Sequence, residues 1–209
     1  MERLRKYKPK FNERIFLGIK LPLETRREIN SILKNFIREG RNFSFIEPEQ
    51  LHLTLKFLGG NISQNSKALI TEAIRPIFAS TKQISIKIDE LLFGFPKQSI
   101  PKVLYFNVNE NEELTNLVSL INRRIRKLHL NDVFNIIEGK KSIFHLTVGR
   151  IKHSSNRHYK IKIINLIKEI GLKPFEFTAN EVFLIKSVRK GNEPNYIDVC
   201  SFEFKKSSD

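Results

Sequence analysis

Apolar and polar residues alternate most clearly at 51–59, where leucines alternate with His52, Thr54 and Lys56 until a glycine ends the pattern. A period of two places every second side chain on one face of a strand, so this segment predicts a strand. Similar alternation, or a short unbroken apolar run, predicts the other strands. They are expected at 14–21, 43–46, 51–59, 84–88, 102–108, 144–149, 175–178, 181–187 and 196–204.

Apolar residues at helical spacing predict helices between these strands. They are expected at 24–39, 63–78, 114–128 and 159–170. Gly40 and Gly171 stand where a glycine commonly ends a helix, and Pro76 is expected to kink or shorten the second helix. Helices combined with antiparallel strands predict an α+β fold.

The segment at 144–149 repeats the one at 51–59. Each copy holds a histidine and a threonine two residues apart: His52 with Thr54, and His145 with Thr147. Residues i and i+2 share a face of a strand, so each pair projects from one face. We therefore expect one bilobal domain over 1–209, with two antiparallel sheets, helices packed outside and a pseudo-twofold central cleft. Residues 1–12 are expected to be a mobile basic lead.

Length and composition fit a packed globular protein. The chain has 209 residues, 40% hydrophobic residues and 17 phenylalanines, enough for a sizeable core. No apolar run approaches 18 residues, so no transmembrane helix is expected, and the N-terminus lacks the apolar region of a secretory signal. The single cysteine, Cys200, has no internal disulfide partner. We expect a cytoplasmic protein.

The net charge of +15 makes polyanions such as RNA natural partners. The basic residues are spread along the chain, which favours a broad attractive field over a separate binding arm. The alternative is that the excess charge only keeps the protein in solution.

Two histidines facing each other across a cleft are suited to acid–base catalysis near neutral pH, because their ordinary pKa lies near 6.5. Cleavage of a phosphodiester needs one group that accepts a proton from the nucleophile and one that donates a proton to the leaving oxygen. The hydroxyls of Thr54 and Thr147 are candidate donors to the phosphate oxygens. This chemistry requires no metal and no cofactor. The alternative is two structural histidines on ordinary strands; two histidines without nearby carboxylates or thiols make a poor metal site.

These motifs resemble the paired H-x-T-x motifs of the 2H phosphoesterase superfamily. More closely, the chain resembles the bacterial and archaeal RNA 2',3'-cyclic phosphodiesterases, also known as 2'-5' RNA ligases. The resemblance spans most of the chain and includes segments 14–22, 48–59, 95–96 with 101–105, and 145–150. One departure is Phe144, where the family often has proline.

The resemblance implies a mechanism and a substrate class. RNA with a 2',3'-cyclic phosphate end, or a cyclic nucleotide, would bind between the lobes. His145 would act as general base on water and His52 as general acid on the 3'-oxygen, giving a 2'-phosphate. The symmetric motifs do not themselves say which histidine is the acid. No obligate protein partner and no membrane contact are implied.

Two cations near the motifs are secondary candidates for binding substrate. Alternation places Lys56 on the His52 face, although a solvated lysine is the simpler interpretation. Arg150 falls on the face opposite His145 unless a bulge at Gly149 turns it round, and a structural salt bridge is the alternative.

Other functions remain open from sequence. One is a module of the same fold that binds RNA ends or nucleotides with little turnover. Another is 2'-5' RNA ligation as the reverse reaction, and a third is RNA binding through positive charge alone. His129, His153 and His158 lack a threonine two residues on, and we expect them to be dispensable.

Overall fold

The structure is a computed structural model that describes residues 13–38, 43–96, 98, 101–133, 143–151, 157–190 and 193–206. Its elements in chain order are β1 (Glu13–Lys20), α1 (Leu23–Arg38), β2 (Phe43–Phe45), the 3-10 helix η2 (Pro48–Gln50), β3 (His52–Gly60), α2 (Gln64–Ser80), β4 (Ile84–Phe93), β5 (Val103–Val108), α3 (Glu112–Arg126), β6 (His145–Ile151), α4 (Arg157–Ile170), β7 (Phe175–Ala179), β8 (Glu181–Lys190) and β9 (Glu193–Glu203). The α+β fold expected from sequence is confirmed.

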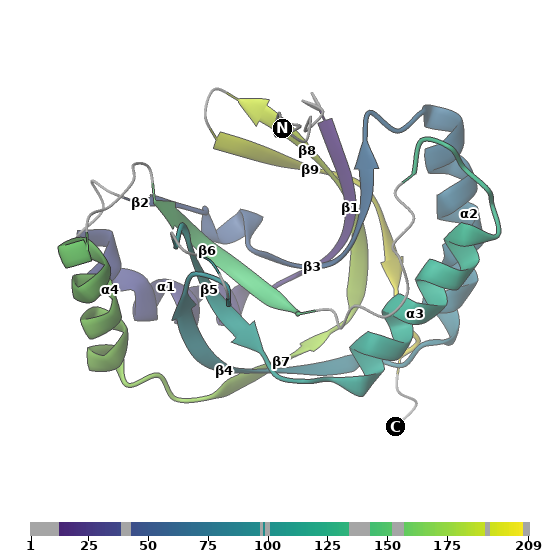
Figure 1. Ribbon diagram of the computed structural model, residues 1–209. Coiled ribbons are helices and arrows are strands. Elements are labelled where there is room, and N and C mark those ends of the chain that lie inside the picture. The colour runs from purple at the N-terminus through teal and green to yellow at the C-terminus, as the bar shows by residue number, and fades with distance from the viewer. Residues whose placement is uncertain are drawn as a thin grey trace, which may run out of the picture.

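The strands form one nine-stranded sheet in the order β7-β4-β5-β6-β3-β1-β8-β9, with β2 paired to β6. All its strand pairs are antiparallel, and the sheet curls strongly (Figure 1). One half holds β1, β3, β8 and β9, and the other holds β2 and β4 to β7. The halves meet where β3 pairs with β6, through Leu53 and Leu146. The two sheets expected from sequence are therefore continuous at this junction.

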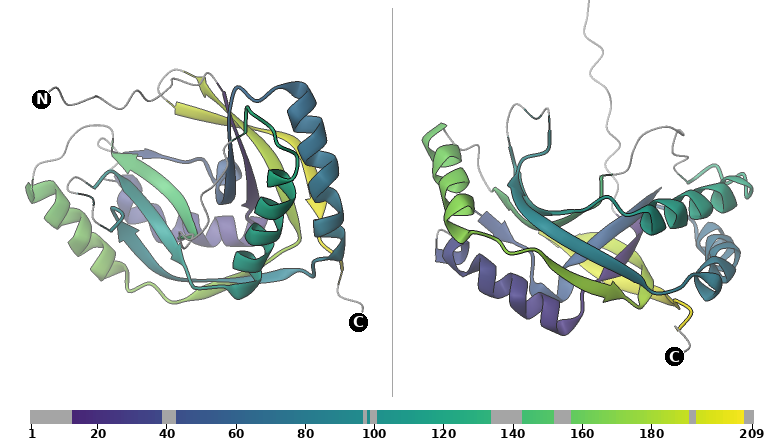
Figure 2. Two further views of the ribbon diagram at one scale, coloured as in Figure 1. Left: turned by 45° about the vertical axis from the view of Figure 1, so that its right-hand side comes forward. Right: turned by 90° about the horizontal axis from the view of Figure 1, so that it is seen from below.

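Two helices lie outside each half of the sheet. Helices α2 and α3 pack together beside β9 and β3, whereas α1 and α4 pack together beside β4 and η2 (Figures 1 and 2). The chain exchanges helices between the halves: α1 follows β1 but lies with the second half, and α3 follows β5 but lies with the first. The two lobes are therefore interleaved along the sequence and need no linker.

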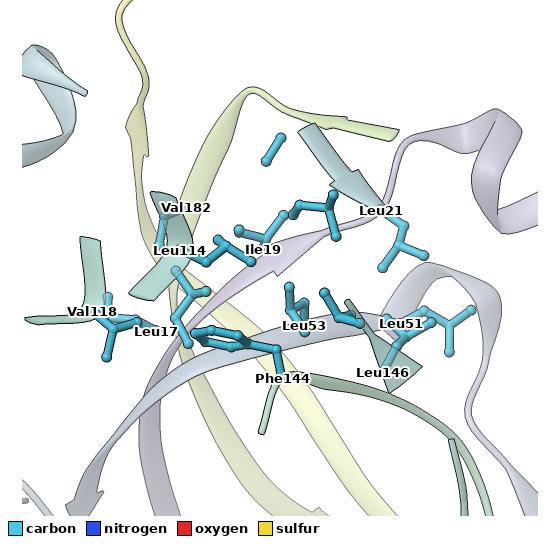
Figure 3. Packing of buried hydrophobic residues seen from close by; sticks show 14 of the residues in the cluster. Leu17, Ile19, Leu21, Leu51, Leu53, Leu114, Val118, Phe144, Leu146 and Val182 are labelled. Carbon is cyan, nitrogen blue, oxygen red and sulfur yellow. The ribbon is translucent and has the colours of Figure 1, made fainter. Parts of the chain in front are cut away.

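The core is continuous across the junction of the two halves. Leu53, Leu146 and Phe144 are at most 5% exposed and belong to one apolar cluster with residues from β1 and α3 (Figure 3). Leu114 and Val118 of α3 are in the same cluster. Burial of this apolar surface fixes how β3 and β6 lie against each other.

Polar side chains cap the N-termini of α2 and α3. Ser63 accepts a hydrogen bond from the Ser66 backbone N–H at 3.1 Å, and Asn111 caps α3 in the same way through the Leu114 N–H at 3.0 Å. Pro76 does not end α2, which continues to Ser80.

Two sequence predictions fall outside the described residues: the mobile lead at 1–12 and the helix end at Gly40. None of the described helices is long and apolar enough to cross a membrane.

Leu146→Ala is expected to lower the free energy of unfolding by about 3 kcal/mol, because it opens a cavity in a core that is close-packed on both sides of the junction. Urea unfolding followed by circular dichroism measures the loss. Leu120→Ala, at a side chain that is 42% exposed, is the matched control and should cost less than about 0.5 kcal/mol. Equal losses in the two variants would show that the junction is not a tightly packed core.

Candidate active site

The junction of β3 and β6 brings the two histidines together. Leu53 and Leu146 are paired and point into the core, being 0% and 1% exposed. Adjacent residues of a strand point to opposite faces, so His52 and His145 both project from the other face of the sheet. The charge of His145 acts on His52, which places the two rings in one electrostatic environment.

The two threonines lie on the same face as their histidines. Thr54 is paired with Gly18 of β1, and Thr147 is paired with Tyr105 of β5. A Cβ atom at Gly18 would lie 3.2 Å from the Leu53 carbonyl oxygen, so glycine allows β1 to approach β3 closely beside Thr54.

His52 is held by one hydrogen bond and two aromatic rings. Its Nδ1 lies 2.8 Å from the Gln50 carbonyl oxygen. A carbonyl only accepts, so Nδ1 carries the proton and Nε2 keeps its lone pair when the ring is neutral. Its ring lies 4.9 Å from Phe16 and 4.6 Å from Tyr196, centroid to centroid. Packing and the hydrogen bond together fix the ring.

His145 is held in the corresponding way. Its Nδ1 lies 3.1 Å from the carbonyl oxygen of Ile143, again two residues upstream. Its ring centroid is 4.7 Å from that of Phe95 and 5.7 Å from that of Tyr105. Each histidine therefore contacts one phenylalanine and one tyrosine, and each presents Nε2 as the nitrogen free to react.

Burial lowers the pKa of both histidines below the usual 6.5, since desolvation disfavours the charged imidazolium. The backbone carbonyl at each Nδ1 opposes this effect. Nearby positive charge adds to it: Lys20, His145 and Arg150 act on His52, and Arg150 acts on His145. Both rings are thus predominantly neutral at pH 7 when no anion is bound.

Arg150 reaches the cleft because β6 contains a β-bulge. Leu104 pairs with Gly149 and Tyr105 with Thr147, which leaves Val148 as an extra residue. The bulge reverses the alternation beyond it and turns Arg150 to the histidine face. Its charge acts on both histidines. From sequence, Arg150 was expected on the face opposite His145 unless a bulge at Gly149 turned it round. The structure contains such a bulge, with Val148 as the extra residue beside Gly149.

The prediction that Lys56 shares the His52 face is wrong. Leu17 pairs with Lys56 and Gly18 with Thr54, so Leu55 is an extra residue and the alternation reverses after it. Lys56 is only 3% exposed and lies within the electrostatic reach of Arg126 on α3. Burial and then Arg126 lower the Lys56 pKa from 10.5 to about 8.

A cavity of about 210 Å³ adjoins His52 through Gln50 and Tyr196, which both line it. Arg150 and Phe45 of β2 line it as well. Asn195 is a further lining residue, and its side-chain amide lies 3.4 Å from that of Gln50, which links η2 to β9. This end of the cleft combines a cation, aromatic rings and amide groups.

Sequence reasoning missed Phe16 and Tyr196, which contact His52. A signal for Phe16 was present, because it alternates with the core residues Ile15 and Leu17 and so belongs to the cleft face of β1. Tyr196 gave no such signal, since a register shift between β8 and β9 interrupts the alternation near it.

The remaining histidines were predicted to be dispensable. His129 lies just beyond the C-terminus of α3, with a positive φ of 50°. His153 and the side chain of His158 lie outside the described residues. Within the described part of the chain, no group of three or more His, Cys, Asp or Glu residues is placed to hold a metal ion.

The chain matches the family described as the AKAP7 2'5' RNA ligase-like domain over residues 16–201. It is 27% identical over 191 residues to an RNA 2',3'-cyclic phosphodiesterase of Archaeoglobus fulgidus, covering 91% of this chain and 99% of the relative. It is 31% identical over 164 residues to an RNA 2',3'-cyclic phosphodiesterase of Aquifex aeolicus, covering 76% and 80%.

Solved structures share the fold. A protein of Thermus thermophilus superposes with a TM-score of 0.70 at 21% identity, covering 93% of this chain and 100% of that one. Escherichia coli LigT in complex with 3'-AMP gives a TM-score of 0.66 at 15% identity, covering 92% and 98%.

The Lys56 environment predicts that Lys56→Met stabilises the protein at pH 7 by about 1–3 kcal/mol, because the folded state disfavours the charged ammonium. Between pH 8 and 10.5 the unfolded chain keeps a proton that folded Lys56 has lost. The wild-type free energy of unfolding therefore gains a contribution that rises with pH across this window, and the variant lacks it. Urea unfolding at pH 7, 8.5 and 10 measures the difference. Lys87→Met, at an exposed lysine, is the control; a Lys56→Met variant less stable than wild type at pH 7 would refute the assignment.

Proposed function

The chain belongs to the 2H phosphoesterase family, and from that premise we propose that it hydrolyses 2',3'-cyclic phosphate ends of RNA to 2'-phosphates. The observation that carries the proposal is the junction of β3 and β6, from which two histidines project on one face with Nδ1 anchored and Nε2 free. This arrangement suits paired proton transfer without a metal or cofactor.

In the proposed reaction the cyclic phosphate lies between the two Nε2 atoms. Nε2 of His145 accepts a proton from water while the water oxygen bonds to phosphorus. The bond from phosphorus to the 3'-oxygen breaks, and His52 donates the proton that the 3'-oxygen takes up. The product has a 3'-hydroxyl and a 2'-phosphate. The assignment of His52 as acid and His145 as base follows the family resemblance.

The negative charge of the transition state develops on the non-bridging phosphate oxygens. We assign the hydroxyls of Thr54 and Thr147 to these oxygens, because each lies two residues from a histidine on the same face of its strand. Arg150 is assigned to the substrate phosphate from the open end of the cleft. Lys56 has no role in this scheme, since its side chain is buried away from the histidines.

Substrate binding favours the protonated form of the histidine that acts as the acid. Both histidines are neutral in the empty cleft, yet the acid must be protonated before it can donate. A phosphodiester anion between the rings favours the imidazolium form and raises the histidine pKa. The same anion is attracted by Arg150 and by the net charge of +15. The proposed substrate thus helps to protonate the histidine that acts as its acid.

A cytoplasmic location stays a prediction.

The direct test is turnover of a short RNA ending in a 2',3'-cyclic phosphate, with EDTA present. We expect conversion to the 2'-phosphate, and a loss of at least about a hundredfold in His52→Ala and in His145→Ala. Thr54→Val and Thr147→Val should each lose about tenfold to a hundredfold by removing a donor to the transition state. Phosphorus NMR identifies the product isomer.

His129→Ala and Thr178→Val are matched controls that should retain wild-type rates. No turnover by the wild-type protein would overturn the proposal, and activity that disappears with EDTA would overturn its metal-free form. Binding that survives both histidine substitutions, without product from wild type, would instead indicate a module that binds RNA ends.

The lowered histidine pKa values predict the pH profile. The acid limb of kcat/KM reports deprotonation of the base, and the alkaline limb reports loss of the proton from the acid. Both groups of the free enzyme have a pKa below 6.5, so kcat/KM is expected to be maximal below pH 6.5. The kcat profile should lie at higher pH, because bound phosphodiester raises both values. A kcat/KM maximum above pH 7 would contradict the burial of the two rings.

A further inference from the structure

A second cavity, of about 770 Å³, adjoins His145 on the side away from β3. Asn107 of β5 lines it and is paired with His145, while Tyr105 lines it and is paired with Thr147. Ile143, whose carbonyl oxygen anchors the His145 ring, also lines it. The cavity therefore lies beside the proposed general base, whose strand partner and anchoring residue both line it.

The charge of this cavity differs from that of the cavity at Arg150. Glu110 and Glu112 line it, at the start of α3, and its described lining contains neither lysine nor arginine. A third carboxylate, Glu90, lies close enough to Tyr105 that it adds to the effect of burial in raising the tyrosine pKa. The cavity at Arg150 thus has one cation and one carboxylate, Glu47, in its lining, whereas the described lining of this cavity has carboxylates alone.

We propose that this carboxylate-lined cavity is the nucleophile side of the site, and that Glu110 and Glu112 make the enzyme select water over the 5'-hydroxyl of a second RNA. The inference rests on the proposed function. Because His145 takes the proton of the nucleophile, the nucleophile lies on its side of the phosphorus, and any chain attached to it extends past His145 into the cavity.

Ligation uses the same proton transfers as hydrolysis. The 5'-oxygen of an acceptor bonds to phosphorus, its proton passes to His145, and the bond from phosphorus to the 3'-oxygen breaks as His52 supplies a proton. The result is a 2'-5' linkage. The cavity is large enough for a nucleotide, so size alone does not exclude an acceptor strand. The first acceptor phosphates would instead lie near two solvent-exposed carboxylates, whose like charge repels them.

The experiment measures partitioning between the two nucleophiles. RNA ending in a 2',3'-cyclic phosphate is incubated with excess 5'-hydroxyl RNA, and the ratio of 2'-5' ligated product to 2'-phosphate is determined. The Glu110→Gln/Glu112→Gln double variant is expected to raise this ratio about tenfold over wild type. Hydrolysis of a cyclic mononucleotide should stay within about twofold, because water carries no charge. The exposed pair Glu72→Gln/Glu169→Gln is the matched control and should leave the ratio unchanged.

A second arm uses an uncharged nucleoside as the 5'-hydroxyl acceptor. Its partition ratio is expected to be the same in wild type and in the Glu110/Glu112 variant, since no phosphate enters the cavity. An unchanged RNA ratio in that variant, or an equal rise with RNA and with nucleoside, would overturn the inference. Wild-type hydrolysis in these reactions tests the proposed function separately. If wild type hydrolyses the cyclic phosphate but the ratio of ligated to hydrolysed product is unchanged in the double variant, only the role of the carboxylates is refuted.

Discussion

The buried contact between Leu53 and Leu146 is the constraint on which the site depends. It is the pair through which the two halves of the sheet are joined, and both side chains are withdrawn from solvent. Since strand residues alternate between faces, fixing these two leucines in the core also fixes His52 and His145 on the opposite face. The placement of the two histidines is thus set by hydrophobic packing behind them. The aromatic contacts described for each histidine are with strand residues of its own half of the sheet and, for His145, also with Phe95 between β4 and β5.

The two histidine strands, β3 and β6, share a further feature: each has a β-bulge at the residue after its threonine. Leu55 and Val148 are the extra residues, and each reverses the alternation that follows. In β6 this brings Arg150 into the cleft. In β3 it buries Lys56 against α3, at a cost reflected in its lowered pKa. One local distortion, repeated in both halves, therefore turns Arg150 to the histidine face in one lobe and buries Lys56 in the other.

Much of the fold follows from sequence, because alternation of period two and of period 3.6 is strong in this chain. The four helices and the α+β class were predicted, and the paired histidine strands indicated that two lobes share one cleft. The failures have physical causes. Alternation assigns faces only while a strand is regular, so the bulge in β3 made the predicted face of Lys56 wrong. Phe95 and Tyr196 contact histidines that lie 50 and 144 positions away in sequence (145 − 95 and 196 − 52), and such contacts depend on strand order. The exchange of α1 and α3 between halves is likewise a tertiary feature without a local signal.

The central claim is that one phosphate is shared by the Nε2 atoms of two histidines whose Nδ1 atoms stay protonated. Nitrogen-15 NMR of the imidazole rings during titration with inorganic phosphate tests it most directly, with His52→Gln and His145→Gln to assign the signals. The account predicts that both rings respond together with one-to-one stoichiometry, that both pKa values rise, and that Nδ1 keeps its proton throughout. A response from only one ring, or two separate binding constants, would contradict it.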